Sequence, residues 1–135
     1  MKKKIIFKGA ATALVTPFDA LGRIDFTAFG ELIERQISEG IDALVICGTT
    51  GESATLTDTE RRRCISFAVE KAGGRVPIIA GTGSNNAEYA KELSCFASSE
   101  GVDGILVVTP YYNKATEKGM EKYYLSIAES ATSPI

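Results

Sequence analysis

Four apolar runs alternate with four amphipathic segments along the chain. The runs cover residues 11–15, 43–47, 77–80 and 105–108. Apart from Thr12, every residue of these runs is apolar, and the runs do not alternate regularly between apolar and polar positions, which is typical of parallel strands covered on both faces. The runs recur about every 30 residues, the length of one βαβ unit. The pattern therefore predicts a parallel α/β sheet.

The segments between and after these runs each carry one apolar stripe at helical spacing. Asp25 is expected to cap the first helix, and residues 57–60 (Thr-Asp-Thr-Glu) fit a capping box for the second. Asn85 or Asn86 is expected to cap the third. The four stripes are, in chain order, Phe26, Phe29, Ile33 and Ile37; Cys64, Ile65, Ala68, Val69 and Ala72; Ala90, Leu93 and Ala97; and Met120, Tyr123, Tyr124, Ile127, Ala128 and Ala131.

Periodicity alone does not separate a doubly wound sheet from a barrel, because both are built from βαβ units. The Gly81-Thr82-Gly83 turn lacks the third glycine of a dinucleotide-binding fingerprint, since Asn86 stands at that place. Nucleotide binding is therefore disfavoured. The chain ends at Ser133-Pro134-Ile135, where the repeat predicts the start of a fifth strand.

Composition narrows the classes of function. A chain of 135 residues that is 44% hydrophobic and 24% charged is ordinary for one globular domain. The formal charge of −2 leaves no basic surplus for nucleic-acid phosphates, and the lysines at positions 2–4 are expected to form a solvated tail. No segment approaches the ~20 apolar residues of a membrane span. We expect a cytoplasmic protein that binds neither nucleic acid nor membranes.

The chain has three cysteines and no histidine. Cys47, Cys64 and Cys95 each lie within an apolar pattern, which predicts buried free thiols rather than a disulfide or a metal site. The absence of histidine excludes a Ser-His or Cys-His nucleophile pair, so proton transfer must use tyrosine, threonine, lysine or carboxylates. Neither a metal nor a cofactor is predicted.

Polar segments follow two of the apolar runs, at Gly48–Ser53 and Thr109–Lys114. Parallel α/β folds place their chemistry at the carboxyl ends of strands. The glycines flanking Thr49 and Thr50 allow backbone N–H groups to hold a small carboxylate. A plain tight turn before the second helix explains the same residues equally well.

The tyrosine pair in the second segment has two interpretations as well. Tyr111 and Tyr112 lie just past a predicted strand end, and aromatic pairs often serve only in packing. A phenol near Thr49 would instead pass protons in a site without histidine.

These segments resemble the dihydrodipicolinate synthase family, which belongs with N-acetylneuraminate lyase to the pyruvate-dependent class I aldolases. The resemblance extends from Gly9 onward, and the pairing of its two main motifs favours the synthase branch. It implies a (βα)4 fold, the N-terminal half of a (β/α)8 TIM barrel, so residues 1–135 are expected to be a partial barrel that stops before strand five. The matching motifs are Thr16-Pro17-Phe18, Gly48-Thr49-Thr50-Gly51-Glu52, Gly81-Thr82-Gly83 and Thr109-Pro110-Tyr111-Tyr112-Asn113-Lys114.

The resemblance implies a lyase of the diaminopimelate pathway of lysine biosynthesis. In the family, a lysine on strand six forms a Schiff base with pyruvate, and the enamine attacks L-aspartate 4-semialdehyde. By motif, Gly48 and Thr50 would bind the pyruvate carboxylate, Thr49 would relay protons, and Tyr112 would relay protons in a neighbouring subunit's site. The family's central tyrosine and its Schiff-base lysine fall beyond Ile135. We therefore expect this chain alone to bind pyruvate weakly and to be inactive.

A lysine-effector site is also implied by the resemblance, near Ser53, Ala54, Asn85 and Tyr111. The chain departs from the family pattern at three positions around it. Asp58 and Arg61 stand where feedback-sensitive bacterial members carry histidines, and Tyr89 stands at the usual acidic position. These departures count against inhibition by lysine.

Two other functions remain open: a non-catalytic half-barrel that acts in binding or assembly, and a fragment of an N-acetylneuraminate lyase-like aldolase. A four-stranded half-barrel has two open sheet edges and a bare concave face. We expect that face to carry Leu14, Val45, Ile79 and Val107. The chain should therefore form a homo-oligomer or pair with a complementing C-terminal half.

Overall fold

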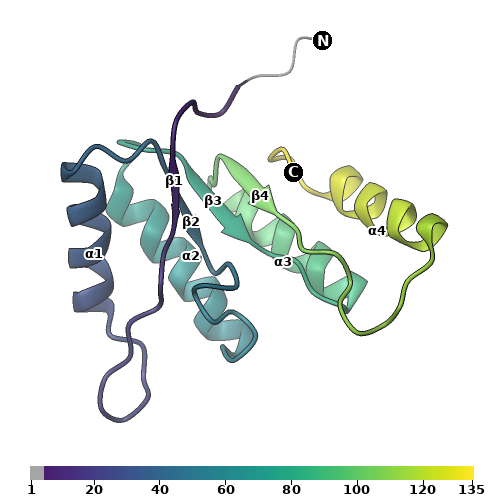
Figure 1. The fold of residues 1–135 in the computed structure, drawn as a ribbon, viewed down its shortest axis with the longest axis horizontal. Coiled ribbons are helices and arrows are strands. Elements are labelled where there is room, and N and C mark those ends of the chain that lie inside the picture. The colour runs from purple at the N-terminus through teal and green to yellow at the C-terminus, as the bar shows by residue number, and fades with distance from the viewer. Residues whose placement is uncertain (1–4) are drawn as a thin grey trace.

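Strands and helices alternate along the whole chain in the computed structural model, which describes residues 5–135; the lysines at positions 2–4 lie outside the described residues (Figure 1). The elements are β1 (Ala11–Ala13), α1 (Phe26–Ser38), β2 (Ala43–Ile46), α2 (Asp58–Ala72), β3 (Ile78–Gly81), α3 (Ala87–Ser99), β4 (Gly104–Leu106) and α4 (Glu117–Ser130). The predicted (βα)4 order is confirmed, although β1 and β4 end two residues earlier than the apolar runs.

The four strands form one parallel sheet in the order β1-β2-β3-β4. The helices pack in chain order, α1 on α2, α2 on α3 and α3 on α4, and cover one face of the sheet (Figure 1). No helix within residues 5–135 covers the other face. The carboxyl ends of all four strands lie at the same edge of the sheet, as the parallel arrangement requires.

Each helix begins at a residue whose side chain accepts a hydrogen bond from the first turn. Asp25 accepts from the Ala28 N–H, and Thr57 forms the predicted capping box with the third residue of α2. Of the two asparagines considered for α3, Asn86 is the cap. Thr116 caps α4.

The two faces of the sheet differ sharply in exposure. Val45 and Ile79 share one row with Ala13 on the uncovered, concave face, as predicted. The prediction was wrong for Leu14 and Val107, which lie an odd number of residues from that row and are 3% and 9% exposed in the helix-facing core. An uninterrupted apolar run lacks the alternation that would fix which residues face which side. The exposed side chains of the concave face are Val15, Leu106 and Val108, at 51%, 49% and 45%.

Two of the three cysteines are buried free thiols, as predicted, and the third is not. Cys47 and Cys64 lie in the core, whereas Cys95 is exposed on α3, with its Sγ 3.3 Å from the Ser130 carbonyl oxygen. Cys95 is two residues from Leu93, so it falls on the far side of the helix from that core residue.

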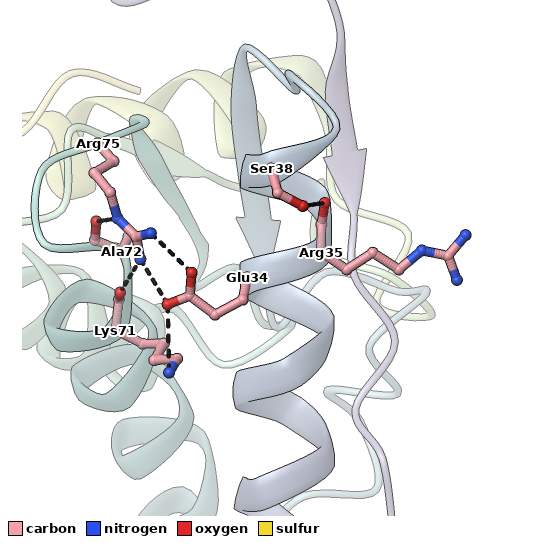
Figure 2. A network of polar contacts seen from close by, with 6 residues as sticks. All are labelled: Glu34, Arg35, Ser38, Lys71, Ala72 and Arg75. Carbon is pink, nitrogen blue, oxygen red and sulfur yellow. Dashed lines mark hydrogen bonds and ion pairs between the residues drawn. The ribbon is translucent and has the colours of Figure 1, made fainter.

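An ion-pair cluster on the surface joins α1 to α2 (Figure 2). Both Glu34 carboxylate oxygens accept from the Arg75 guanidinium, at 2.7 and 2.8 Å, and Lys71 Nζ lies 3.3 Å from one of them. These contacts, the Arg75 hydrogen bond foremost, lower the Glu34 pKa to about 2. Figure 2 shows Arg35, on the same helix, pointing away from this cluster.

The segment after α4 returns to the outer edge of β4. The Ile105 N–H donates to the Pro134 carbonyl at 2.8 Å, and the Ser133 hydroxyl donates to the Val102 carbonyl at 2.9 Å. One edge of the sheet is thus partly paired by the chain itself.

Candidate functional site

The Gly48–Ser53 turn follows β2 directly, at the carboxyl edge of the sheet. It folds back through two hydrogen bonds, from the Gly51 N–H to the Gly48 carbonyl and from the Glu52 N–H to the Thr49 carbonyl. Within residues 5–135, the N–H groups of Gly48, Thr49 and Thr50 donate to no other group. Successive unpaired backbone donors of this kind can hold an anionic group such as a carboxylate.

The neighbouring strands hold this turn from both sides. On the β1 side, the buried Thr16 hydroxyl donates to the Gly51 carbonyl at 2.7 Å. On the β3 side, Gly81 lies so close that a Cβ added there would be 2.2 Å from the Cys47 carbonyl oxygen. Cys47 itself has a φ of 56°, in the left-handed region that non-glycine residues seldom adopt. The shape of the turn is therefore fixed by packing around it.

Arg61 lies behind the turn, on the first part of α2. Its side chain is 5% exposed, and its Nη2 donates to the Gly81 carbonyl at 2.9 Å. Its guanidinium lies 5.6 Å from the centroid of the Tyr89 ring, and its own carbonyl is 3.9 Å from Cys47 Sγ. Sequence reasoning treated Arg61 only as a departure from a family pattern. The signal that would have found it is its helical spacing with Ile65 and other buried residues of α2.

A second buried polar group supports the loop after β3. The Tyr123 hydroxyl donates to the Ser84 carbonyl at 2.8 Å and accepts from the Ser84 N–H at 3.2 Å. Burial raises the Tyr123 pKa above its usual value, so the phenol stays protonated and can keep donating. The sequence placed Tyr123 in the apolar stripe of α4, where a stripe does not distinguish tyrosine from phenylalanine.

The Thr109–Lys114 segment forms the loop after β4. Asn113 Nδ2 donates to the Asn85 carbonyl at 2.8 Å, which ties this loop to the one after β3. Tyr112 is 97% exposed and has a φ of 71°, so its ring makes almost no contact with its own chain. Tyr111 is about half exposed.

The predicted site residues are only partly brought together. A small cavity of about 40 Å³ behind the turn is lined by Gly48, Thr49 and Ser53, together with Arg61. Thr50 lies outside this cavity, on the exposed side of the turn. Neither tyrosine of the Tyr111-Tyr112 pair lines it.

The residues around the implied effector site are spread over three loops, which follow β2, β3 and β4. Ser53 lines the cavity and Ala54 is exposed, while Asn85 and Tyr111 belong to the loops that the Asn113 bond connects. Among the departures from the family pattern, burial raises the Tyr89 pKa, and the Arg62 hydrogen bond lowers the Asp58 pKa.

Two further properties concern the described part of the chain as a whole. No helix within residues 5–135 is long and apolar enough to cross a bilayer. The same residues contain no group of three or more histidine, cysteine, aspartate or glutamate side chains placed to hold a metal ion.

Residues 6–135 match the model of the Dihydrodipicolinate synthetase family. The chain belongs to this family. It is 52% identical over 130 residues to the 4-hydroxy-tetrahydrodipicolinate synthase of Thermoanaerobacter sp. (strain X514), covering 96% of this chain and 43% of that protein. The similarity to this dihydrodipicolinate synthetase family member thus covers nearly all of the chain, whereas the chain spans less than half the length of that relative.

Solved structures of family members superpose on the chain closely. The dihydrodipicolinate synthase of Aquifex aeolicus matches with a TM-score of 0.93 and 46% identity, over 96% of this chain and 44% of that one. The E. coli K12 prophage protein YagE, a dihydrodipicolinic acid synthase family member solved with pyruvate, matches with a TM-score of 0.93 and 37% identity over the same shares. The predicted half of a TIM barrel is therefore confirmed as the fold.

Proposed function

We propose that this chain carries the pyruvate-carboxylate site of a cytoplasmic 4-hydroxy-tetrahydrodipicolinate synthase. The parent reaction condenses pyruvate with L-aspartate 4-semialdehyde through a lysine Schiff base. The carrying observation is the set of unpaired N–H groups at Gly48, Thr49 and Thr50, at the carboxyl end of β2. The synthase named among the relatives and the pyruvate present with YagE support this substrate.

The proposed roles are those that the family resemblance implies, and the exposure and chemistry of each side chain support them. Thr50 and the adjacent backbone hold the carboxylate, because their donors are free at the edge of the sheet. Thr49 relays a proton, because its hydroxyl is one of the groups that can transfer protons in a chain without histidine. Tyr112 serves the site of a neighbouring subunit, a role that its 97% exposed ring supports.

We further propose that this chain alone forms no Schiff base. A lysine amine attacks a carbonyl only when neutral, which requires desolvation in an apolar pocket or a nearby cation. Within residues 5–135 no lysine is buried. Lys71 and Lys91 pair with glutamates on the helices, and Lys114 lies in an exposed loop.

Borohydride reduction in the presence of pyruvate, followed by intact mass measurement, tests the missing Schiff base. We expect no adduct. A covalent pyruvyl adduct at one stoichiometric site would show that the proposal is wrong.

Pyruvate titration tests the carboxylate site itself. Binding should be millimolar at best, about −4 kcal/mol, because the backbone donors are present while half of a barrel wall is not. Thr50→Val should weaken it, and Thr59→Val, an exposed threonine on α2, should not. Micromolar affinity, or equal affinity in the two variants, would contradict the assignment.

The exposed apolar side chains on the concave face of the sheet favour a second function, self-association of the chain. Val15, Leu106 and Val108 are about half exposed there, and no helix of residues 5–135 covers this face of the sheet (Figure 1). We infer that a second copy of the chain covers this face, because a TIM barrel contains eight strands and each copy supplies four. Tyr112-centred contact between copies is the alternative geometry.

Light scattering on the purified chain tests this assembly. We expect a dimer, with Leu106→Glu on the concave face favouring the monomer and Leu125→Glu on the outer surface of α4 leaving the dimer intact. A wild-type monomer at tens of micromolar would rule out the second copy. Conversion to a defined complex only on adding a separate C-terminal half would identify that half as the occupant instead.

A further inference from the structure

Two of the three cysteines lie side by side in the core, although they are far apart in the sequence. Cys47 follows β2 directly, and Cys64 lies near the middle of α2. Both are free thiols and almost fully buried. Cys47 Sγ is 3.9 Å from the carbonyl oxygen of Arg61, one turn before Cys64 on α2, and a side-chain hydrogen bond connects the two thiols. The fold thus brings together two sulfur atoms that could be joined by a disulfide.

The backbone at Cys47 accounts for this contact. Val45, two residues earlier, lies on the concave face, so continued alternation along the strand would turn Cys47 to that face as well. The φ of 56° at Cys47 interrupts the alternation, and its thiol lies against α2 instead. A left-handed backbone at a residue other than glycine is costly and is often found at functional sites. Here that backbone places the Cys47 sulfur beside the second thiol.

The two thiols differ in how readily they ionise. The hydrogen bond with Cys47 lowers the Cys64 pKa, against the opposing effects of burial and of the Glu60 charge. The same hydrogen bond, together with burial, raises the Cys47 pKa, so Cys47 stays protonated. The thiolate is the form of cysteine that reacts with oxidants. Cys64 is therefore the sulfur expected to react first, with Cys47 beside it as the second.

The surroundings of the pair favour oxidation over metal binding. A structural zinc site takes four ligands, and residues 5–135 contain no cluster of three or more side chains suited to hold a metal. Cys47 also lines the cavity of about 40 Å³ behind the turn. A small oxidant such as hydrogen peroxide can reach the pair through this space.

We propose that Cys47 and Cys64 form a redox-active pair that a peroxide converts to an intramolecular disulfide, with Cys64 oxidised first. The cross-link would fasten the end of β2 to α2 and would close a loop that contains the whole Gly48–Ser53 turn. The proposal does not depend on the pyruvate chemistry above, since it concerns only the two sulfur atoms and their oxidant.

The reaction balances with one peroxide molecule for each pair. After Cys64 loses its proton, its thiolate attacks one peroxide oxygen, the O–O bond breaks, and hydroxide leaves a sulfenic acid at Cys64. The hydroxide takes the Cys47 proton and becomes water. The Cys47 thiolate then attacks Cys64 Sγ, which forms the S–S bond and releases a second hydroxide. That hydroxide becomes water with the proton that Cys64 lost, so two thiols and one peroxide give one disulfide and two waters.

Hydrogen peroxide in small excess, added to the folded chain, tests the proposal in a Cys95→Ser background that removes the exposed thiol. The intact mass should fall by two hydrogen atoms, and peptide mapping without reductant should find residues 47 and 64 joined. The oxidised chain should unfold at a higher urea concentration than the reduced chain, because the cross-link restricts the unfolded state. Dithiothreitol should reverse both changes. This measurement keeps both core cysteines, so it does not depend on how core variants fold.

Two variants in the same background test the order of the steps. Cys47→Ser keeps a hydroxyl donor beside Cys64, and dimedone, which captures sulfenic acids, should label Cys64 in it. Cys64→Ser is the matched control and should be labelled at Cys47 about tenfold less, the ratio that one pKa unit gives.

Three outcomes would overturn the proposal. The first is a folded chain that keeps both thiols under peroxide. The second is a disulfide that forms only after the chain has been unfolded in urea. The third, equal dimedone labelling of the two variants, would remove the assignment of Cys64 as the first sulfur to react.

Discussion

Gly81→Ala should destabilise the fold at the point where β3 meets the Gly48–Ser53 turn. A Cβ at residue 81 would lie 2.2 Å from the Cys47 carbonyl oxygen and 2.9 Å from the Gly48 nitrogen. Both are backbone atoms, so a side chain cannot simply rotate away and one of the two backbone segments must move. Crowding of this kind in a packed region costs about 1–3 kcal/mol.

The alanine also restricts the unfolded chain, which returns about 0.4–1 kcal/mol of stability. The net loss should therefore be about 1–2 kcal/mol. For a chain of 135 residues this corresponds to a decrease in Tm of roughly 4–7 °C. Because the shifted backbone carries the Gly48 N–H, pyruvate binding should weaken in the same variant.

Urea unfolding followed by circular dichroism measures this loss. Gly48→Ala is the matched control, since a Cβ there would meet only the Val45 side chain, at an ordinary 3.6 Å. That control should be as stable as wild type or slightly more stable. Equal unfolding midpoints for the two variants would mean that the close approach of β3 to the turn does not constrain the fold.

Three other predictions concern the elements that support the site. The Glu34 pKa of about 2 lies below its usual 4.5, chiefly because of the Arg75 hydrogen bond, so ionised Glu34 stabilises the fold above pH 4.5 and this contribution is lost as the pH falls through about 2. Glu34→Gln should remove this part of the pH dependence of the urea midpoint. An unchanged dependence of the midpoint on pH would mean that the Glu34–Arg75 ion pair does not stabilise the fold. Thr57→Ala should lower the free energy of unfolding by about 1 kcal/mol, because it removes the N-cap of α2. An unchanged free energy of unfolding would mean that the capping box does not stabilise the helix. Tyr123→Phe should cost about 1–2 kcal/mol, because the Ser84 carbonyl and N–H lose their buried partner, and a neutral effect on thermal unfolding would refute that.

The regular elements were predictable because local signals for them agree. A capping side chain at Asp25 or Thr57 precedes an apolar stripe, and each β-run is bounded by turn residues. The face on which a strand residue lies was less predictable, since Leu14 and Val107 lie in runs without a regular alternation of apolar and polar residues. Only the register between strands, which depends on contacts far apart in sequence, assigns each residue to a face.

The turn motif at Gly48–Thr50 could be located from the sequence, but its surroundings could not. Arg61 is buried behind the turn because of how α2 packs on β3. A charged residue in a helix ordinarily indicates a solvent-exposed face, so the sequence did not predict this burial. Cys95 shows the converse error, because an apolar neighbourhood in sequence does not fix the side of a helix. The family resemblance implied that Tyr112 acts in a neighbouring subunit's site, and its exposed ring is consistent with that role.

The single exposed cysteine makes the chain suitable for site-specific labelling without mutagenesis. Cys47 and Cys64 are buried, so a maleimide dye or nitroxide should react first at Cys95, on the outer surface of α3. A label there would sit on the helical layer, remote from the concave face that the second copy is proposed to cover. Resonance energy transfer or dipolar spectroscopy between two such labels would then give the separation between copies directly, and would tell a closed barrel from a pair joined at Tyr112.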